Sequence, residues 1–110
     1  MELTQKKCKP CEGGVPTLTE HQVENYRKTL QTKWEVEDNR KIRRPFEFKD
    51  FKGTIHCVNK IADIAEEEGH HPDMHIYYNM LVIELTTHAI GGLSENDFIL
   101  AAKIEELVQQ

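Results

Sequence analysis

The chain has 110 residues and a formal net charge of -5 at pH 7, with 19 acidic and 14 basic side chains. This length predicts one domain with a modest core, and the acidic balance argues against nucleic acid as the main partner. No apolar run approaches the roughly 20 residues of a membrane span, and the first residues lack an apolar signal segment. We therefore expect a cytoplasmic protein with no membrane partner.

The first 16 residues are polar and contain Gly and Pro, which predicts an N-terminal arm before a single domain over residues 17–110. Cys8 and Cys11 of this arm form a C-x-x-C motif. The motif is half of a zinc site without its second half, and the odd count of three cysteines argues against a disulfide framework. We expect no metal and no cofactor.

The first predicted helix begins after Thr19. Gln22 lies three residues further on, which makes a capping box, and Leu18 with Val23 supplies a hydrophobic staple. Helical spacing of apolar residues continues through the following turns.

Two strands are predicted next, a short one that begins at Trp34 and a longer one over residues 42–48. Asp38-Asn39 between them is typical of a turn. Pro45 lies inside the longer strand and favours an edge position or a bulge.

Apolar residues at helical spacing predict a second helix over residues 50–68, which Gly69 ends in a left-handed cap. A hairpin follows, with strands over residues 74–77 and 81–88 and Asn79 in its turn.

The third predicted helix has Ser94 as its N-cap and Asp97 at its third position, with Leu93 and Phe98 as the staple. A stripe of Ala101, Ile104 and Val108 follows. The order α-β-β-α-β-β-α predicts an α+β fold, in which an antiparallel sheet of about four strands carries three helices on one face.

Four of the six histidines fall within a short stretch, namely His70, His71, His75 and His88. Histidine suits proton transfer in both directions near neutral pH. Pro72 pushes His71 toward an extended conformation, so the two neighbouring rings should point in different directions. His88 precedes a glycine-containing loop, where site residues are common.

Plainer interpretations compete with an acid–base site. A His-His-Pro turn suits a polar helix terminus, where histidine gains from the helix dipole, and a single strand-end histidine is more often a surface residue. His71 and His75 have H-x-x-x-H spacing, but Pro72 argues against the helix that a metal site of this kind requires. Asp97 serves as a capping acid. It also lies on the same side of the predicted helix as the apolar stripe, which allows it to orient a histidine or bind a ligand. The acidic run over residues 66–68 is usual for a solvated face.

Taken together, these residues and their spacing resemble the pterin-4a-carbinolamine dehydratase family. The resemblance rests on an acidic residue four positions before the first histidine, His-His-Pro, an aromatic, a later histidine, and an Asp at the start of the last helix. In this sequence those positions are Glu66, His70, His71, Pro72, Tyr78, His88 and Asp97. Animal members usually have Trp where this chain has Met74, which is similar to the microbial and plant-type branch.

The resemblance implies an enzyme that dehydrates 4a-hydroxytetrahydropterin to quinonoid dihydropterin in tetrahydrobiopterin recycling. It implies that His70, His71 and His88 are catalytic and that Glu66, Pro72 and Asp97 bind the substrate. It also implies a homodimer or homotetramer. Two alternatives are a non-catalytic interaction module, since animal relatives also act as dimerisation cofactors, and a role in another pterin pathway related to molybdopterin.

Overall fold

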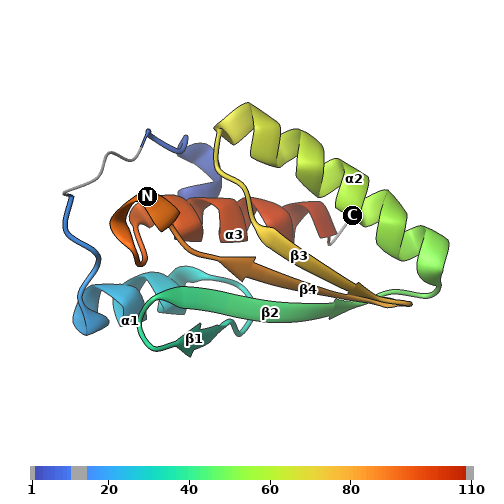
Figure 1. Cartoon of the computed structure of the whole chain (residues 1–110), viewed down its shortest axis with the longest axis horizontal. Helices are drawn as coiled ribbons and strands as arrows, with labels where there is room; N and C mark the ends of the chain where they lie inside the picture. Colours follow the sequence, from blue (N-terminus) through green and yellow to red (C-terminus); the bar gives the residue numbers. More distant parts are fainter. Residues whose placement is uncertain (1, 11–14, 109–110) are drawn as a thin grey trace.

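A computed structural model describes residues 2–10 and 15–108, and its main elements follow the predicted order (Figure 1). Two short 3-10 helices are added, one in the N-terminal arm and one before the last helix. The elements in chain order are η1 (Leu3–Gln5), α1 (Glu20–Thr29), β1 (Glu35–Glu37), β2 (Lys41–Glu47), α2 (Phe51–Glu68), β3 (Asp73–Tyr77), β4 (Met80–Leu85), η2 (His88–Ile90) and α3 (Glu95–Val108).

The four strands form one antiparallel sheet in the order β1-β2-β4-β3, and the three α-helices lie on one face of it (Figure 1). This arrangement confirms the predicted α+β class. Alternate residues of the central strand β4 face the helices, because successive side chains of a strand point to opposite sides. Leu81, Ile83 and Leu85 are completely buried there.

Local capping chemistry sets most of the helix ends. Thr19 and Gln22 form both hydrogen bonds of the predicted capping box at α1. At α2, the side chain of Asp50 accepts from the backbone N–H of Gly53. Gly69 ends α2 with φ of 68°, a left-handed conformation that glycine adopts without steric cost, as predicted.

Both hairpins use residues in the left-handed region. Asp38 and Asn39 have φ of 50° and 55°, and the N–H of Arg40 donates to Glu37 O at 2.9 Å. This geometry is a type I′ turn, whose twist suits an antiparallel pair. In the second hairpin, Tyr78 has φ of 52°, an uncommon conformation for a large side chain.

The Pro45 prediction holds only in part. β2 is a central strand, between β1 and β4, so Pro45 does not lie on an edge strand. The pairing with β1 ends at Arg43, however, and Pro45 lies beyond it with only β4 as a neighbour. That side of β2 is therefore locally an edge, where a missing N–H costs no ladder hydrogen bond.

The last helix, α3, is buried on more sides than the predicted stripe of apolar residues would require. Every residue from Asn96 to Ala102 is buried, as are Ile104 and Glu105. This follows from its position, because α3 packs against η1, α1 and α2, and its apolar side chains belong to the same core cluster as those of the strands. The N-terminal arm takes part in this packing, and Leu3 and Cys8 belong to the core.

Candidate active site

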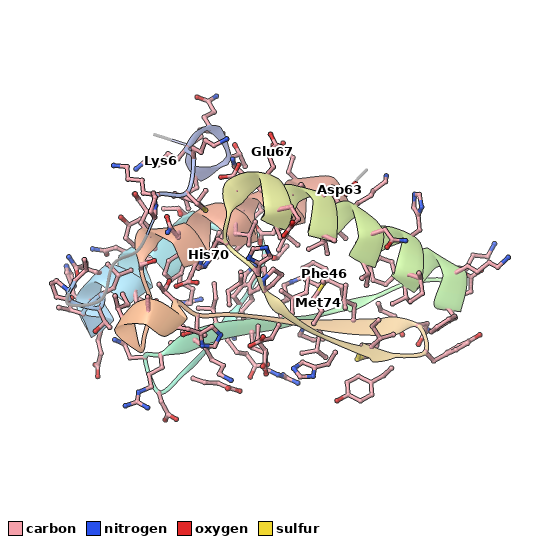
Figure 2. All side chains as sticks on the ribbon, turned by 45° about the horizontal axis from the view of Figure 1, so that its top comes forward. Lys6, Phe46, Asp63, Glu67, His70 and Met74 are labelled. Atoms are coloured by element: carbon pink, nitrogen blue, oxygen red, sulfur yellow. The ribbon has the colours of Figure 1, made fainter. Side chains whose placement is uncertain are left out.

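The His-His-Pro turn lies directly after the left-handed cap of α2. The backbone N–H of His70 still bonds to Ala65 O at 3.2 Å, so the chain leaves the helix in a defined direction. Figure 2 shows His70 between the end of α2 and α3. Its side chain is 12% exposed, whereas that of His71 is 60% exposed. The two neighbouring rings therefore differ in their exposure to solvent.

His88 lies on a small closed loop rather than at the end of a strand. The prediction of a strand over residues 81–88 is wrong in its last part, because β4 ends at Leu85 and His88 begins η2. Thr87 and Gly92 form an isolated bridge, with Thr87 N donating to Gly92 O at 2.9 Å, and this bridge closes the loop. Gly91 completes it with φ of 68°.

The three predicted catalytic histidines meet at one cleft of about 240 Å³, although they come from two distant segments of the chain. His70 and His71 contribute from the end of α2, and His88 from the closed loop. The remaining lining residues are Lys9, Gly69, Thr86, Thr87, Ala89 and Asn96. In the described part of the chain, no side chain bonds to the ring of His88.

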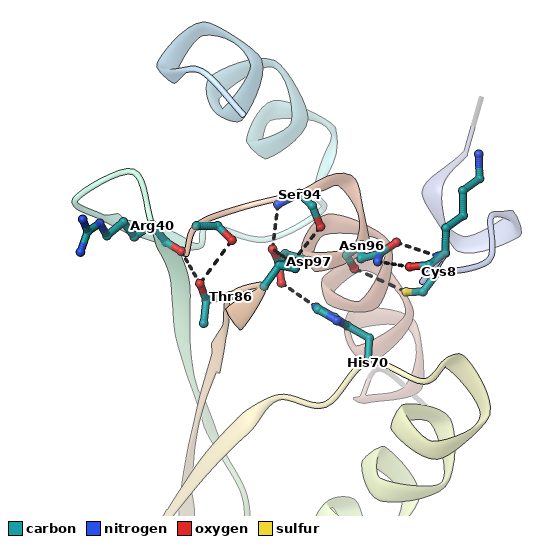
Figure 3. A network of polar contacts seen from close by, with 10 residues as sticks. Cys8, Arg40, His70, Thr86, Ser94, Asn96 and Asp97 are labelled. Atoms are coloured by element: carbon teal, nitrogen blue, oxygen red, sulfur yellow. Dashed lines mark hydrogen bonds and ion pairs between the residues drawn. The ribbon is translucent and has the colours of Figure 1, made fainter. Parts of the chain in front are cut away.

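Asp97 is the centre of the polar network at this cleft (Figure 3). Its side chain is completely buried. One oxygen, Oδ1, lies 2.7 Å from Nε2 of His70. The other, Oδ2, accepts from the Thr87 hydroxyl at 2.8 Å and from the Ser94 backbone N–H at 2.9 Å. The Ser94 contact is the capping interaction predicted for α3, whereas the His70 contact joins α3 to the turn after α2.

The other two predicted substrate-binding residues lie at the margin of the site. Glu66 is 76% exposed and its Oε2 lies 2.5 Å from Nε2 of His71, so it bonds to a histidine of the cleft. Pro72 follows His71 and is not among the lining residues. Tyr78 lies at the far end of β3, at the hairpin tip, and the structure does not bring it to the cleft.

Met74, which replaces the usual Trp of animal members, lies on the helix-covered face of the sheet (Figure 2). It pairs with buried Ile83 and packs against the core. Its neighbour His75 has the opposite orientation and bonds to Glu84 at 3.3 Å. His71 and His75 therefore do not form the metal pair that their spacing allowed.

In residues 2–10 and 15–108, no three His, Cys, Asp or Glu side chains are placed to hold a metal ion. Cys11 lies outside the described residues. Cys8 is buried beside Glu68, and burial is the main reason that the pKa of its thiol rises to about 12.

Sequence reasoning assigned no role in the site to the other six residues that line the cleft, among them Thr87, Asn96 and Lys9. Thr87 immediately precedes His88 at the end of the predicted strand. That position indicated a site residue, but it was assigned to the histidine alone. Asn96 and Lys9 carried no local signal, because they meet each other across a separation of 87 residues.

Comparison with known proteins places these features in a family. The fold and the cleft together define a class of protein, namely a small α+β domain with a cleft lined by histidines. The family model for pterin 4 alpha carbinolamine dehydratase matches residues 16–107. The chain belongs to this family.

Relatives named for this enzyme cover nearly the whole chain. A Nitrosomonas eutropha protein is 52% identical over 97% of this chain and 94% of its own length. A Legionella pneumophila protein is 49% identical over 97% of this chain and 96% of its own.

Two solved structures share the fold. A transcriptional coactivator/pterin dehydratase from Brucella melitensis has a TM-score of 0.77 and 33% identity, over 83% of this chain and 97% of that one. A pterin dehydratase-like RuBisCO assembly factor of the alpha-carboxysome has a TM-score of 0.61 and 22% identity, over 70% of this chain and 90% of that one. The second likeness shows the fold alone.

Within the described ranges, none of the helices is long and apolar enough to cross a membrane.

Proposed function

We propose that this protein dehydrates 4a-hydroxytetrahydropterin to quinonoid dihydropterin, with His70, His71 and His88 as its acid–base groups. The observation that carries the proposal is the convergence of these three histidines on one cleft, with His70 held by a fully buried carboxylate. Family membership supplies the substrate class.

The reaction matches what such a cleft offers. The bond between carbon 4a and its hydroxyl breaks, and a general acid protonates the departing hydroxyl so that it leaves as water. A general base removes a proton from a ring nitrogen, and the electron pair left behind forms the new double bond. Each transfer by a positioned side chain typically contributes about 10²- to 10⁴-fold in rate, and the step needs no redox partner.

The hydrogen bonds of Asp97 favour His70 as the base. Because Oδ2 already accepts two hydrogen bonds, Oδ1 is the oxygen that bonds to Nε2 of His70. A buried carboxylate at this distance favours the tautomer that carries its proton on Nε2. Nδ1 then has the free lone pair. His88, with no protein partner in the described chain, would act as the acid, and His71 would contact the pterin.

The same contacts suggest roles for the three residues expected to bind substrate. Both oxygens of Asp97 are engaged with protein groups, so we assign it to the orientation of His70 rather than to direct contact with the pterin. Glu66 would orient His71. Pro72 would hold the turn extended and shape the rim of the cleft.

The proposal also covers the location of the enzyme, its physiological role and its number of subunits. We propose a cytoplasmic enzyme that recycles tetrahydrobiopterin for an aromatic amino acid hydroxylase and forms a homodimer or homotetramer. β3 lies at one edge of the sheet, and an exposed strand edge favours pairing with another chain. Sedimentation equilibrium of the purified protein would give the number of subunits.

The test of the activity is stopped-flow absorbance after a hydroxylase generates the 4a-carbinolamine. The protein should remove the intermediate faster than buffer alone, and no acceleration would refute the proposal. His88→Ala and His70→Gln should each lower the rate by at least about tenfold. Glutamine still donates a hydrogen bond to Asp97 but exchanges no proton at neutral pH. The exposed His56→Ala on α2 is the matched control and should leave the rate unchanged.

One observation favours an interaction surface as a second function. Large apolar side chains are exposed at the hairpin tip and the start of α2, far along the sheet from the cleft: Phe51, Ile76, Tyr77, Tyr78 and Met80. Exposed apolar patches commonly mark contacts with other proteins. A specific partner that is lost in Tyr77→Ser, together with no dehydratase activity in the unmodified chain, would favour this alternative.

A further inference from the structure

The segment Lys6–Lys9 of the N-terminal arm lies across the two elements that carry the His70–Asp97 pair; we call it the strap. In Figure 1 the arm passes beside the last turn of α2 and the first turn of α3. The family model begins at residue 16, so the strap lies outside the matched domain. This position raises the question of what the strap does for the site.

On the α2 side, the strap is bound to Glu68. The backbone N–H of Cys8 donates to Glu68 Oε1 at 2.8 Å, and Lys103 of α3 donates to Oε2 of the same carboxylate at 2.7 Å. The side chain of Glu68 is only 5% exposed. Glu68 lies two residues before His70, so this contact holds the chain just where it enters the His-His-Pro turn.

On the α3 side, the strap is bound to Asn96, directly before Asp97 (Figure 3). The N–H of Lys9 donates to Asn96 Oδ1 at 2.9 Å, and Asn96 Nδ2 donates to Lys9 O at 2.6 Å. Lys9 and Asn96 both line the histidine cleft. The strap is therefore also part of the wall of the site.

Further contacts keep the strap in place. Lys6 pairs with Glu95 at 2.7 Å, and Glu95 also accepts from the hydroxyl of Tyr26 on α1 at 3.0 Å. Leu3 of η1 is 8% exposed and belongs to the core cluster. An apolar anchor on one side and paired amide bonds on the other leave the strap little freedom to move.

From this arrangement we infer that the strap is a positioning device, which joins Glu68 to Asn96 and so sets the separation of His70 and Asp97. The inference rests on the proposed function, because it concerns the acid–base pair of that reaction. It assigns no contact with the reacting atoms to the strap itself. Misplacement of a catalytic group by about 1 Å can cost on the order of 100-fold in rate, so a strap of this kind has a measurable effect.

The test compares Asn96→Ala with Asn59→Ala, an exposed asparagine on α2, in the full chain. Three measurements are made. They are kcat and KM for the pterin, the ring nitrogen-15 chemical shifts of His70, and the alkylation rate of Cys8 in a background with Cys11→Ser and Cys57→Ser. Because Cys8 is buried and its backbone is bound to Glu68, its thiol reports release of the strap.

For Asn96→Ala we expect faster Cys8 alkylation, His70 shifts that move toward those of a histidine with mixed tautomers, and kcat lowered by about 10- to 100-fold. KM should change less than kcat. Asn59→Ala should match the parent chain in all three measurements. Released Cys8 with unchanged His70 shifts and unchanged kcat would overturn the inference.

A second variant covers the case in which Asn96→Ala does not fold. Deletion of residues 2–9 removes the strap but leaves the whole sheet and all three α-helices, and circular dichroism checks that they form. A folded deletion chain with the parent's kcat and His70 shifts also overturns the inference. If the parent chain has no dehydratase activity, the proposed function fails, yet the His70 shifts and Cys8 alkylation still decide whether the strap positions the pair.

Discussion

Thr87→Val tests the hydrogen-bond network of Asp97 most directly. Valine has nearly the shape of threonine, but it cannot donate the 2.8 Å hydrogen bond to Oδ2 of the buried carboxylate. Thr87 is 3% exposed, so water has little access to replace the lost donor. A hydrogen bond to a charged group contributes about 1.5–3 kcal/mol. We therefore expect the free energy of unfolding to fall by about 2 kcal/mol.

Urea denaturation followed by the fluorescence of Trp34 measures this change, because it is the one tryptophan of the chain and is 1% exposed. For a domain of this size, the loss corresponds to a Tm lower by roughly 8 °C. The dehydratase kcat should also fall, because Asp97 would hold His70 less firmly.

Thr29→Val is the matched control. This exposed hydroxyl donates to Tyr26 O at the end of α1, and its loss should change the free energy by less than about 0.5 kcal/mol. A Thr87→Val protein as stable and as active as the parent chain would refute the role given to this network.

Three further predictions concern groups away from the histidines. The Glu105→Gln variant should have a free energy of unfolding lower by about 1–3 kcal/mol in urea denaturation. The carboxylate of Glu105 is 2% exposed and accepts four hydrogen bonds from the connection between α1 and β1. An amide cannot accept all four, because its nitrogen is a donor. The exposed neighbour Glu106→Gln should be neutral, and equal losses in both variants would contradict this reasoning. Burial opposes ionisation of Glu68, but its bonds to Cys8 N–H and Lys103 outweigh burial and lower its pKa. Stability from this group is therefore present above the usual glutamate pKa of about 4.3 and is lost as pH falls through the folded value. Glu68→Gln should flatten the fall in unfolding free energy between about pH 5 and pH 3, and an unchanged slope would argue against it. Burial raises the pKa of the Cys8 thiol to about 12, so iodoacetamide should modify it more slowly than a cysteine in a short peptide at pH 8, unless the arm opens.

The parts of the fold that the sequence predicted well are those governed by neighbouring residues. Thr19 and Gln22 are three residues apart, and their capping box formed as expected. Gly69 and the Asp38-Asn39 turn follow from the φ values that these residues tolerate. The strand order β1-β2-β4-β3 could not be derived, because hydrophobic alternation shows which face of a strand is buried but not which strands are neighbours.

Contacts between distant residues account for most of what the sequence did not show. Glu105 carries no local signal in the sequence, yet its partner Trp34 lies 71 residues away and makes it a buried acceptor. The contact of Lys9 with Asn96 is of the same kind. In each case a polar side chain is buried because a partner from another element supplies its hydrogen bond, and a single sequence carries no period or spacing that reveals such a pair.

Asp97 shows where the boundary between the two kinds of contact lies. Its oxygen Oδ2 accepts from the N–H of Ser94, three residues before it, and this local contact follows from the capping pattern alone. Its oxygen Oδ1 meets His70, which is 27 residues away on another element. A carboxylate has two oxygens, and a capping role uses one of them, so a buried capping acid has an acceptor left for a long-range partner. The pattern S-x-x-D before an apolar helix therefore predicts more than a helix start when the acid lies on the buried line. It predicts that a donor from elsewhere in the chain must reach the second oxygen, and in this chain the donor with that position is a histidine of the cleft.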